Sequence, residues 1–172
     1  MVKLWQCEIC GDPYVGDEAP SNCPFCGAKK ENIKEAKLAE VNFDVQLNEK
    51  DKANVEKALE LELSNVAFYG CAEKKTNDEE GKQLFKALRK VEFEHASIWK
   101  KILKLKELPE IKEPCHEDNK DNLEESHQRE TRAIKFYQQA AKETENKRVK
   151  RLFEVIVEVE TDHLKLSEVR LK

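Results

Sequence analysis

The sequence predicts a mostly α-helical chain in which a four-helix bundle follows a small metal-binding module. Three observations support this prediction. Apolar residues recur with helical periodicity in four segments after residue 48. A constellation of Glu, Tyr, Glu and His occurs twice, and two Cys-X-X-Cys motifs lie near the N-terminus. The length of 172 residues accommodates both units in one chain.

The N-terminal motifs read Cys7-Glu-Ile-Cys10-Gly11 and Cys23-Pro24-Phe25-Cys26-Gly27. Two such knuckles can place four thiolates tetrahedrally around one metal ion, and a glycine after the second cysteine lets the backbone turn toward the sulfur. Tetrahedral sulfur selects iron or zinc without deciding between them. Because we identify no secretory signal and no apolar run of transmembrane length, we expect a reducing cytoplasm and thiolate ligands rather than disulfides.

The later segments carry one constellation twice, with every member displaced by 68 positions. In each half a Glu is followed by a Tyr after seven residues, by a second Glu after thirty, and by a His three residues further on. Steps of three and seven residues put side chains on one helical face, and thirty residues join two antiparallel helices. The two sets are Glu62, Tyr69, Glu92 and His95, and Glu130, Tyr137, Glu160 and His163.

Four carboxylates and two imidazoles facing one bundle interior form the ligand set of a di-iron or di-manganese site. The proposed ligands are Glu62, Glu92, His95, Glu130, Glu160 and His163. Buried without cations, the carboxylates would lose several kcal/mol each on desolvation and would raise one another's pKa. Two divalent cations remove that cost.

The alternative is that these are surface glutamates on charged helices. All four histidines have a Glu three residues before them, so that spacing alone is weak evidence for a metal site. The pair Glu113 and His116 does not even lie on one helical face, because Pro114 between them prevents a regular helix. The pairs ending in His95 and His163 differ because they occupy apolar stripes, where a core-facing hydrophobic residue is expected.

Capping residues predict the helix boundaries. Asn48 precedes the first periodic segment, Asp78 the second, and Asp118 or Asn119 the third, while Asn77 and Asn146 mark the two hairpin turns. We expect the metal-binding module to span residues 1–37 and the bundle to span 46–172, with a polar connector between them.

Pro109 and Pro114 are expected to stop the second helix and to bracket a connection from about residue 108 to 118. This connection must return along the bundle, so that both Glu-X-X-His pairs reach the same level. Eleven extended residues span about 36 Å, which is barely sufficient. A taut crossover makes exchange of helices between subunits feasible.

Residues 7–27 resemble the short rubredoxin module of rubrerythrins, including Tyr14, Gly16, Ala19-Pro20 and Cys23-Pro24. The remainder, with its doubled Glu and Glu-X-X-His pattern, is similar to the ferritin-like domain of that family. The module precedes the bundle, an order that resembles the reverse rubrerythrins. The resemblance implies one iron in the sulfur site and a di-iron centre in the bundle, with zinc still possible among the four cysteines.

The sequence departs from the family pattern at Ala133. Many rubrerythrins carry an additional Glu at this position. In those proteins one iron moves between this Glu and a histidine when the redox state changes. Its absence predicts two metals held symmetrically, with one imidazole each. His127, one turn before Glu130, is a candidate replacement.

The resemblance implies a peroxidase that reduces hydrogen peroxide to water and protects against oxidative stress. Electrons would reach the di-iron centre through the sulfur-bound iron from a reductase or another rubredoxin. The alternatives are a ferroxidase or a dioxygen-reducing oxidase, and a binding module with zinc and no catalysis. Tyr69 and Tyr137 are expected to orient ligating carboxylates, or else to be ordinary core aromatics.

Assembly, partners and the remaining cysteines complete the expectations. With a net charge of −4 and no basic stripe, neither nucleic acid nor a membrane is an expected partner. The module is expected near a bundle end, so that electron transfer would cross a head-to-tail homodimer. Cys71 and Cys115 are predicted to be unpaired thiols, and Trp5 and Trp99 to serve in packing.

Overall fold

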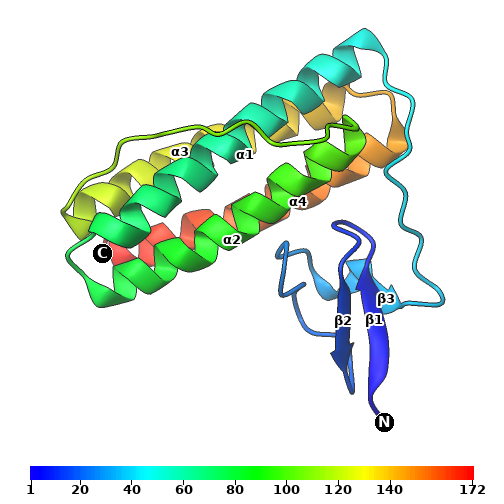
Figure 1. Cartoon of the computed structure of the whole chain (residues 1–172), viewed down its shortest axis with the longest axis horizontal. Coiled ribbons are helices and arrows are strands. Elements are labelled where there is room, and N and C mark those ends of the chain that lie inside the picture. The colour runs from blue at the N-terminus through cyan, green and yellow to red at the C-terminus, as the bar shows by residue number, and fades with distance from the viewer.

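Four long helices form an antiparallel bundle in the computed structural model, which describes residues 1–172 (Figure 1). They are α1 (Glu49–Lys75), α2 (Glu79–Ile102), α3 (Asn119–Glu143) and α4 (Lys147–Arg170). The pairs α1 with α2 and α3 with α4 are hairpins, and α1 also packs on α3. The predicted fold class, a ferritin-like bundle preceded by a rubredoxin-like module, is confirmed.

The helix starts follow from side-chain caps that satisfy otherwise free backbone N–H groups. The capping oxygens of Asn48, Asp78 and Asn146 accept hydrogen bonds from the first turns of α1, α2 and α4. At α3 the cap is Asp118, which accepts from two backbone amides, whereas Asn119 is already the first helical residue.

The second helix ends earlier than the prolines predict. α2 stops at Ile102, and Lys104 adopts a left-handed φ of 55°. The amide of Leu105 then reaches back to the carbonyl of Lys100 at 3.1 Å, which closes the helix end as a Schellman motif. Residues 103–118 form the crossover, so it is longer than predicted, and it returns along the bundle (Figure 1).

The crossover is bonded to α1 by a disulfide between Cys71 and Cys115, whose Cα atoms are 5.8 Å apart. The prediction of two unpaired thiols was therefore wrong. It considered the compartment and each cysteine's local surroundings, but the pairing depends on the path of the crossover. That path brings residues 44 positions apart in sequence into bonding distance.

The N-terminal module contains a three-stranded antiparallel sheet in the order β2-β1-β3. The strands are β1 (Lys3–Cys7), β2 (Pro13–Gly16) and β3 (Ile33–Glu35), and a short 3-10 helix, η1 (Lys30–Asn32), precedes β3. Leu4 pairs with Val15, and Cys7 pairs with Ile33. The sheet holds the first knuckle, while residues 21–29 form the second.

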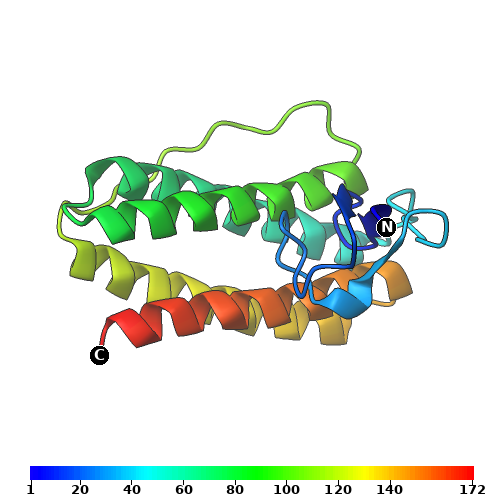
Figure 2. The same ribbon diagram turned by 90° about the horizontal axis from the view of Figure 1, so that it is seen from below.

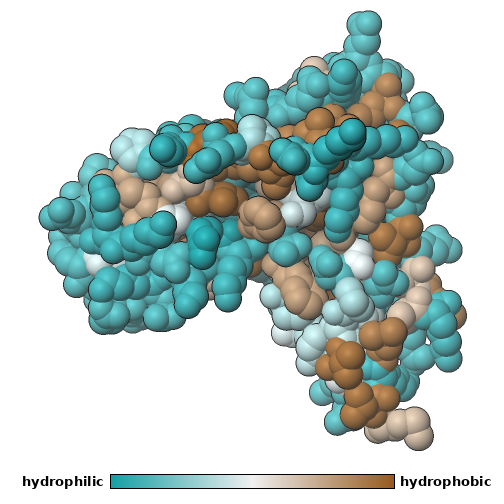
Figure 3. All heavy atoms as spheres, viewed as in Figure 1, coloured by the Kyte–Doolittle hydropathy of each residue, from teal (hydrophilic) through white to brown (hydrophobic).

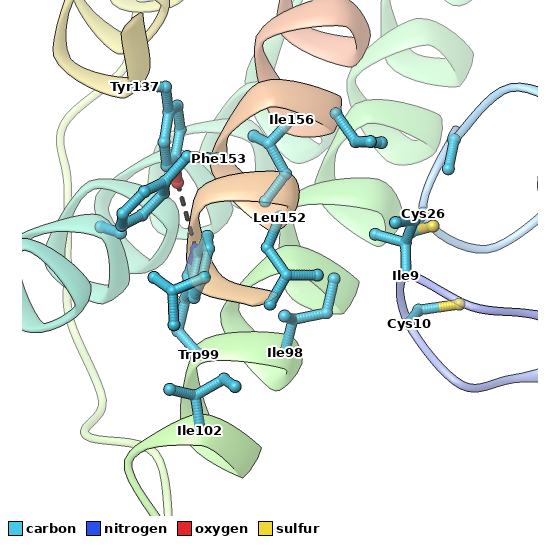
Figure 4. Packing of buried hydrophobic residues seen from close by; sticks show 14 of the residues in the cluster. Ile9, Cys10, Cys26, Ile98, Trp99, Ile102, Tyr137, Leu152, Phe153 and Ile156 are labelled. Atoms are coloured by element: carbon cyan, nitrogen blue, oxygen red, sulfur yellow. Dashed lines mark hydrogen bonds between the residues drawn. The ribbon is translucent and has the colours of Figure 1, made fainter. Parts of the chain in front are cut away.

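The module packs against the face that α2 and α4 present (Figure 2). Ile9 and Cys26 of the module belong to the same buried cluster as Ile98 of α2 (Figure 4). A Cβ added to Gly27 would lie 2.8 Å from Val159 of α4, so the two surfaces touch closely. The module reaches from the end of the bundle at Arg148 to His95, so the expectation that it lies out of reach of the cluster was wrong.

Polar contacts fix the same interface. Lys101 Nζ donates to the carbonyl of Cys10 at 2.8 Å. Arg151 donates to the Glu8 carboxylate at 3.3 Å and to the Asn32 side chain at 3.1 Å. The sequence argument treated the module as tethered only by its connector, whereas these nonlocal contacts seat it on the bundle.

The exposed surface is largely hydrophilic over the helices (Figure 3). Exposed apolar side chains occur on the module, where Val2, Leu4 and Val15 are more than half exposed. No helix has both the length and the apolar composition that crossing a membrane requires.

Candidate metal centres

The sulfur site consists of Cys7, Cys10, Cys23 and Cys26, all buried. The Sγ atoms of Cys7 and Cys26 are 3.7 Å apart, as are those of Cys10 and Cys23. A tetrahedral ion with metal–sulfur bonds of about 2.3 Å separates its sulfurs by about 3.8 Å. The four thiols are therefore already spaced to hold one metal ion.

The glycines after each knuckle have the conformation that the motif demands. Gly11 and Gly27 have φ values of 85° and 78°, in the left-handed region that favours glycine. Their amides donate to the carbonyls of Cys7 and Cys23, and the next amide, that of Asp12, donates to Cys10 Sγ at 3.4 Å. Both knuckles thus wrap the backbone around the sulfur.

The carboxylate cluster gathers the six residues that the repeat predicts, all buried. They form two overlapping groups, each with ligand atoms within 4.8 Å of one another: Glu62, Glu92, His95 and Glu160, and Glu92, Glu130, Glu160 and His163. One helix supplies each carboxylate, because the 68-residue repeat places equivalent faces of two hairpins opposite each other.

Glu92 and Glu160 belong to both groups and point one oxygen at each imidazole. His95 Nδ1 lies 3.3 Å from Glu92 Oε2 and 3.2 Å from Glu160 Oε1. His163 Nδ1 lies 3.0 Å from Glu92 Oε1 and 3.1 Å from Glu160 Oε2. This arrangement suits two carboxylates that bridge two ions, with Glu62 and Glu130 as terminal ligands.

The two tyrosines cross between the hairpins. The Tyr69 hydroxyl donates to Glu130, and the Tyr137 hydroxyl donates to Glu62. Tyr69 also contacts Ser126 Oγ at 2.9 Å, whereas Trp99 Nε1 donates to Tyr137 at 3.2 Å (Figure 4). Each tyrosine therefore orients one carboxylate, Glu130 or Glu62, and hydrogen-bonds neither Glu92 nor Glu160.

Comparison with known proteins agrees with this geometry. The model of the family described as Rubrerythrin matches residues 53–168, most of the chain. The chain belongs to the rubrerythrin family. A model described as the rubredoxin-like domain of rubrerythrin matches residues 5–34, so the predicted domain order is confirmed.

Reverse rubrerythrin-1 of Clostridium acetobutylicum is 25% identical to the chain over 135 residues, which cover 72% of this chain and 70% of the relative. Membership of the rubrerythrin family indicates an oxidoreductase, and the sulfur site and carboxylate cluster suggest that it binds iron.

Burial shifts the pKa values of the carboxyl groups in the cluster. It raises the pKa of Glu62 well above the ordinary value, and the charge of Glu92 adds to this effect. Burial, then the charge of Glu160, does the same to the pKa of Glu130. At the bridging pair burial acts in the same direction, but hydrogen bonds from the histidines outweigh it and lower the pKa of both Glu92 and Glu160.

The imidazoles respond in the opposite sense. Burial lowers the pKa of His163, but hydrogen bonds to Glu160 and Glu92 raise it further, to about 10. Burial likewise opposes the charge on His95, and the neighbouring carboxylates again prevail, so that its pKa lies well above the ordinary value. Without metal, protons hold the cluster near electrical neutrality.

The donor set fits divalent iron. Buried polar atoms that make no well-aligned hydrogen bond within the protein are concentrated in this cluster: Glu62 Oε2, both oxygens of Glu92, His95 Nδ1, Glu130 Oε2 and Glu160 Oε1. Unpaired buried polar atoms cost about 1–3 kcal/mol each, so a fold rarely collects six of them at one place without a ligand. Carboxylate oxygen and imidazole nitrogen are ligands that iron accepts.

One hydrogen bond joins the two centres within the chain. His95 Nε2 lies 2.9 Å from the carbonyl oxygen of Cys26. A carbonyl only accepts, so Nε2 carries a proton, and Nδ1 is the nitrogen that would bind a metal after losing its own proton. The sequence could not reveal this contact, because it uses a backbone oxygen 69 positions away.

His127 and Ala133 lie close to the cluster in sequence but supply no ligand atom to it. His127 Nδ1 is 3.4 Å from Ser167 Oγ, and neither group of potential ligands includes it. Ala133 is buried on α3. Asn65, which sequence reasoning did not single out, is also buried on α1.

Proposed function

We propose that this rubrerythrin-family protein is a non-haem di-iron peroxidase that reduces hydrogen peroxide to water and protects the cell from oxidative stress. The observation that carries the proposal is the hydrogen bond between His95 and the Cys26 carbonyl at 2.9 Å. It supports a dedicated path for electrons between the sulfur site and the carboxylate cluster. An iron-storing ferroxidase needs no such donor.

In this proposal Cys7, Cys10, Cys23 and Cys26 hold one iron. Glu62, Glu92, His95, Glu130, Glu160 and His163 would hold two further irons, and Glu92 and Glu160 belong to both groups of ligands. When bound, the pair of irons supplies the two electrons that, with two protons, convert one hydrogen peroxide molecule to two water molecules. We assign residues 1–37 to the electron-donating domain and 46–172 to the peroxide-reducing domain.

The surrounding residues have roles that their contacts support. Tyr69 and Tyr137 each donate a hydrogen bond to a terminal carboxylate, which holds that carboxylate in position and keeps a proton beside it. His95 donates from Nε2 to Cys26, so its ring cannot rotate without breaking contact with the module. The four reduced cysteines of the sulfur site and an external reductase or rubredoxin fit a cytoplasmic setting, whereas the disulfide between Cys71 and Cys115 does not argue for it.

The symmetry of the cluster favours a second candidate, an oxidase or ferroxidase that consumes dioxygen. Each imidazole faces the same two bridging carboxylates, and Ala133 provides no additional ligand. In this second candidate function both irons would have equivalent ligands, and neither iron would change position between redox states.

The deciding experiment follows the colour of the sulfur-bound iron. Protein reduced without air is mixed with a stoichiometric amount of hydrogen peroxide or of dioxygen, and the return of the ferric-thiolate absorption is timed. Faster return with peroxide supports the peroxidase. Faster return with dioxygen overturns it in favour of the oxidase, and a colourless, zinc-filled sulfur site removes the proposed electron path.

A further inference from the structure

The disulfide between Cys71 and Cys115 belongs to neither metal centre. Cys71 lies in the last third of α1, and Cys115 lies in the crossover, which runs along the bundle (Figure 1). Both residues are half-buried rather than enclosed in the core. A disulfide near the surface exchanges with thiols in solution only where one of its sulfurs is open to attack, so its surroundings decide its chemistry.

A surface hollow of about 560 Å³ opens beside Cys71. Cys71 and Gly70 of α1 line this hollow together with Ile111 of the crossover, whereas Cys115 does not line it. The volume lies in the range of about 300–1,000 Å³ that is usual for sites of small molecules. A thiol that enters the hollow therefore meets Cys71 first, which makes Cys71 the sulfur that is attacked and Cys115 the leaving group.

The hollow carries a net positive charge. Its charged side chains are Lys74, Lys75, Arg89, Lys112, Glu110 and Glu113. Arg89 pairs with Glu73 at 2.8 Å, and Glu113 contacts Arg129 at 3.5 Å, so these two charges are balanced by their neighbours. The three lysines outnumber Glu110, the one remaining acid. Small anionic thiols are therefore attracted to the hollow more strongly than neutral ones.

Contacts on both sides of Cys115 hold the crossover in place without the disulfide. Before it, Glu113 accepts hydrogen bonds from Ser64 at 2.7 Å and from Arg129 at 3.5 Å. After it, the backbone N–H and the carbonyl of His116 each bond the buried side chain of Asn122 at 2.9 Å. Reduction thus leaves the two thiols close together, in position to form the bond again.

We propose that Cys71 and Cys115 are an exchangeable dithiol–disulfide couple, which reacts in the folded protein with a small anionic thiol that enters this hollow. The thiolate attacks Cys71 Sγ to form a mixed disulfide, and the Cys115 sulfur leaves with the bonding electrons and takes up the proton that the attacking thiol lost. A second thiol attacks the small molecule's sulfur in the mixed disulfide, which releases a small-molecule disulfide and returns Cys71 as a thiol. Two thiols are oxidised and one protein disulfide is reduced, and no step involves the metal centres.

Glutathione and its monoethyl ester test the role of charge, because they carry the same thiol and differ by one negative charge. Metal-loaded protein is incubated with either thiol, and alkylation of Cys71 and Cys115 is followed by peptide mass spectrometry. Glutathione should reduce the disulfide about fivefold faster at low ionic strength, and the ratio should fall toward one in high salt. Rates that do not depend on thiol concentration, or reduction only after unfolding in guanidinium chloride, would reveal an inert structural bond and overturn the proposal.

Charge reversal provides a matched pair of variants. Lys74→Glu combined with Lys112→Glu makes the hollow net negative, so the ester should then react faster than glutathione. Lys142→Glu combined with Lys150→Glu makes the same change of charge in a groove between α3 and α4, and should keep the ratio of the unaltered protein. An unchanged ratio in the first variant, or equal shifts in both, overturns the role of the hollow.

Single-cysteine variants identify the attacked sulfur. In Cys115→Ser, oxidised glutathione should attach one glutathione to Cys71, which is detected as a gain in mass. In Cys71→Ser the same treatment should modify Cys115 more slowly, because Cys115 does not line the hollow. Equal or reversed rates overturn the assignment of Cys71. None of these measurements requires peroxide turnover, so their outcome is independent of the proposed peroxidase.

Discussion

Loading the carboxylate cluster with two divalent metals should expel about four protons per chain at pH 7. Burial raises the pKa of Glu62 and of Glu130, so both are carboxylic acids in the metal-free protein. Both imidazoles are protonated as well, since the pKa of His163 is raised to about 10 and that of His95 also lies well above its ordinary value. Two carboxyl protons and two imidazolium protons must leave when the ligand atoms bind metal.

The same number follows from charge. Without metal, two imidazolium ions balance the carboxylates of Glu92 and Glu160, whose pKa values are lowered. With two divalent ions, four carboxylates and two neutral imidazoles are again neutral overall. Protons compete with metal, so lower pH weakens binding: the product of the two metal association constants should fall by about four powers of ten per pH unit near neutrality.

Isothermal titration calorimetry in two buffers of different ionisation enthalpy measures the number of protons released. The sulfur site is filled beforehand, so that only the bundle takes up metal. Glu62→Gln is the matched control, because its amide has no proton to lose, and it should release about three protons. Release of one proton or none from the unaltered protein would refute the reasoning, since the carboxylates would then be ionised before metal binds.

Three further predictions follow from single contacts. Glu92→Ala and Glu160→Ala should each abolish metal binding in the bundle and leave the sulfur site filled; elemental analysis that finds two bundle metals in either variant would show the bridging assignment to be wrong. Cys71→Ser should lower the free energy of unfolding by up to about 4 kcal/mol, because it opens a loop of 44 residues; denaturation of the unaltered protein with and without reductant checks this, and identical curves contradict it. Gly27→Ala should lower the free energy of unfolding by about 1–2 kcal/mol, because alanine is strained in the left-handed backbone conformation, and its methyl group should displace the module from Val159. The sulfur-bound iron should then reoxidise more slowly although both centres are still filled with metal. An unchanged rate would show that this contact is not part of the electron path.

Mixing two inactive variants should distinguish transfer within a chain from transfer between subunits. Because the His95 to Cys26 contact lies within one chain, a Cys7 variant mixed with a Glu92 variant should recover no peroxide turnover even when subunits exchange. Recovery of turnover would instead support electron transfer between the subunits of a head-to-tail dimer, as the sequence led us to expect.

The sequence by itself determined the features that depend on neighbours along the chain. Helical periodicity placed Glu62, Glu92 and their repeats on inward faces, because three and seven residues return to one side of a helix. Capping chemistry placed the start of α1 at Asn48, since a side-chain oxygen there satisfies a free amide of the first turn. Cysteine spacing and the following glycines predicted the sulfur site for the same local reason.

Only the tertiary structure decided where separately formed parts meet. The end of α2 at Ile102, the disulfide between Cys71 and Cys115, and the contact of His95 with the Cys26 carbonyl all depend on the path of a connection or on how the module packs on the bundle. Such contacts join residues far apart in sequence, and one of them uses a backbone atom that every residue possesses. Amino-acid pattern therefore carries no signal for them, whereas packing of the module and the crossover on the bundle fixes them.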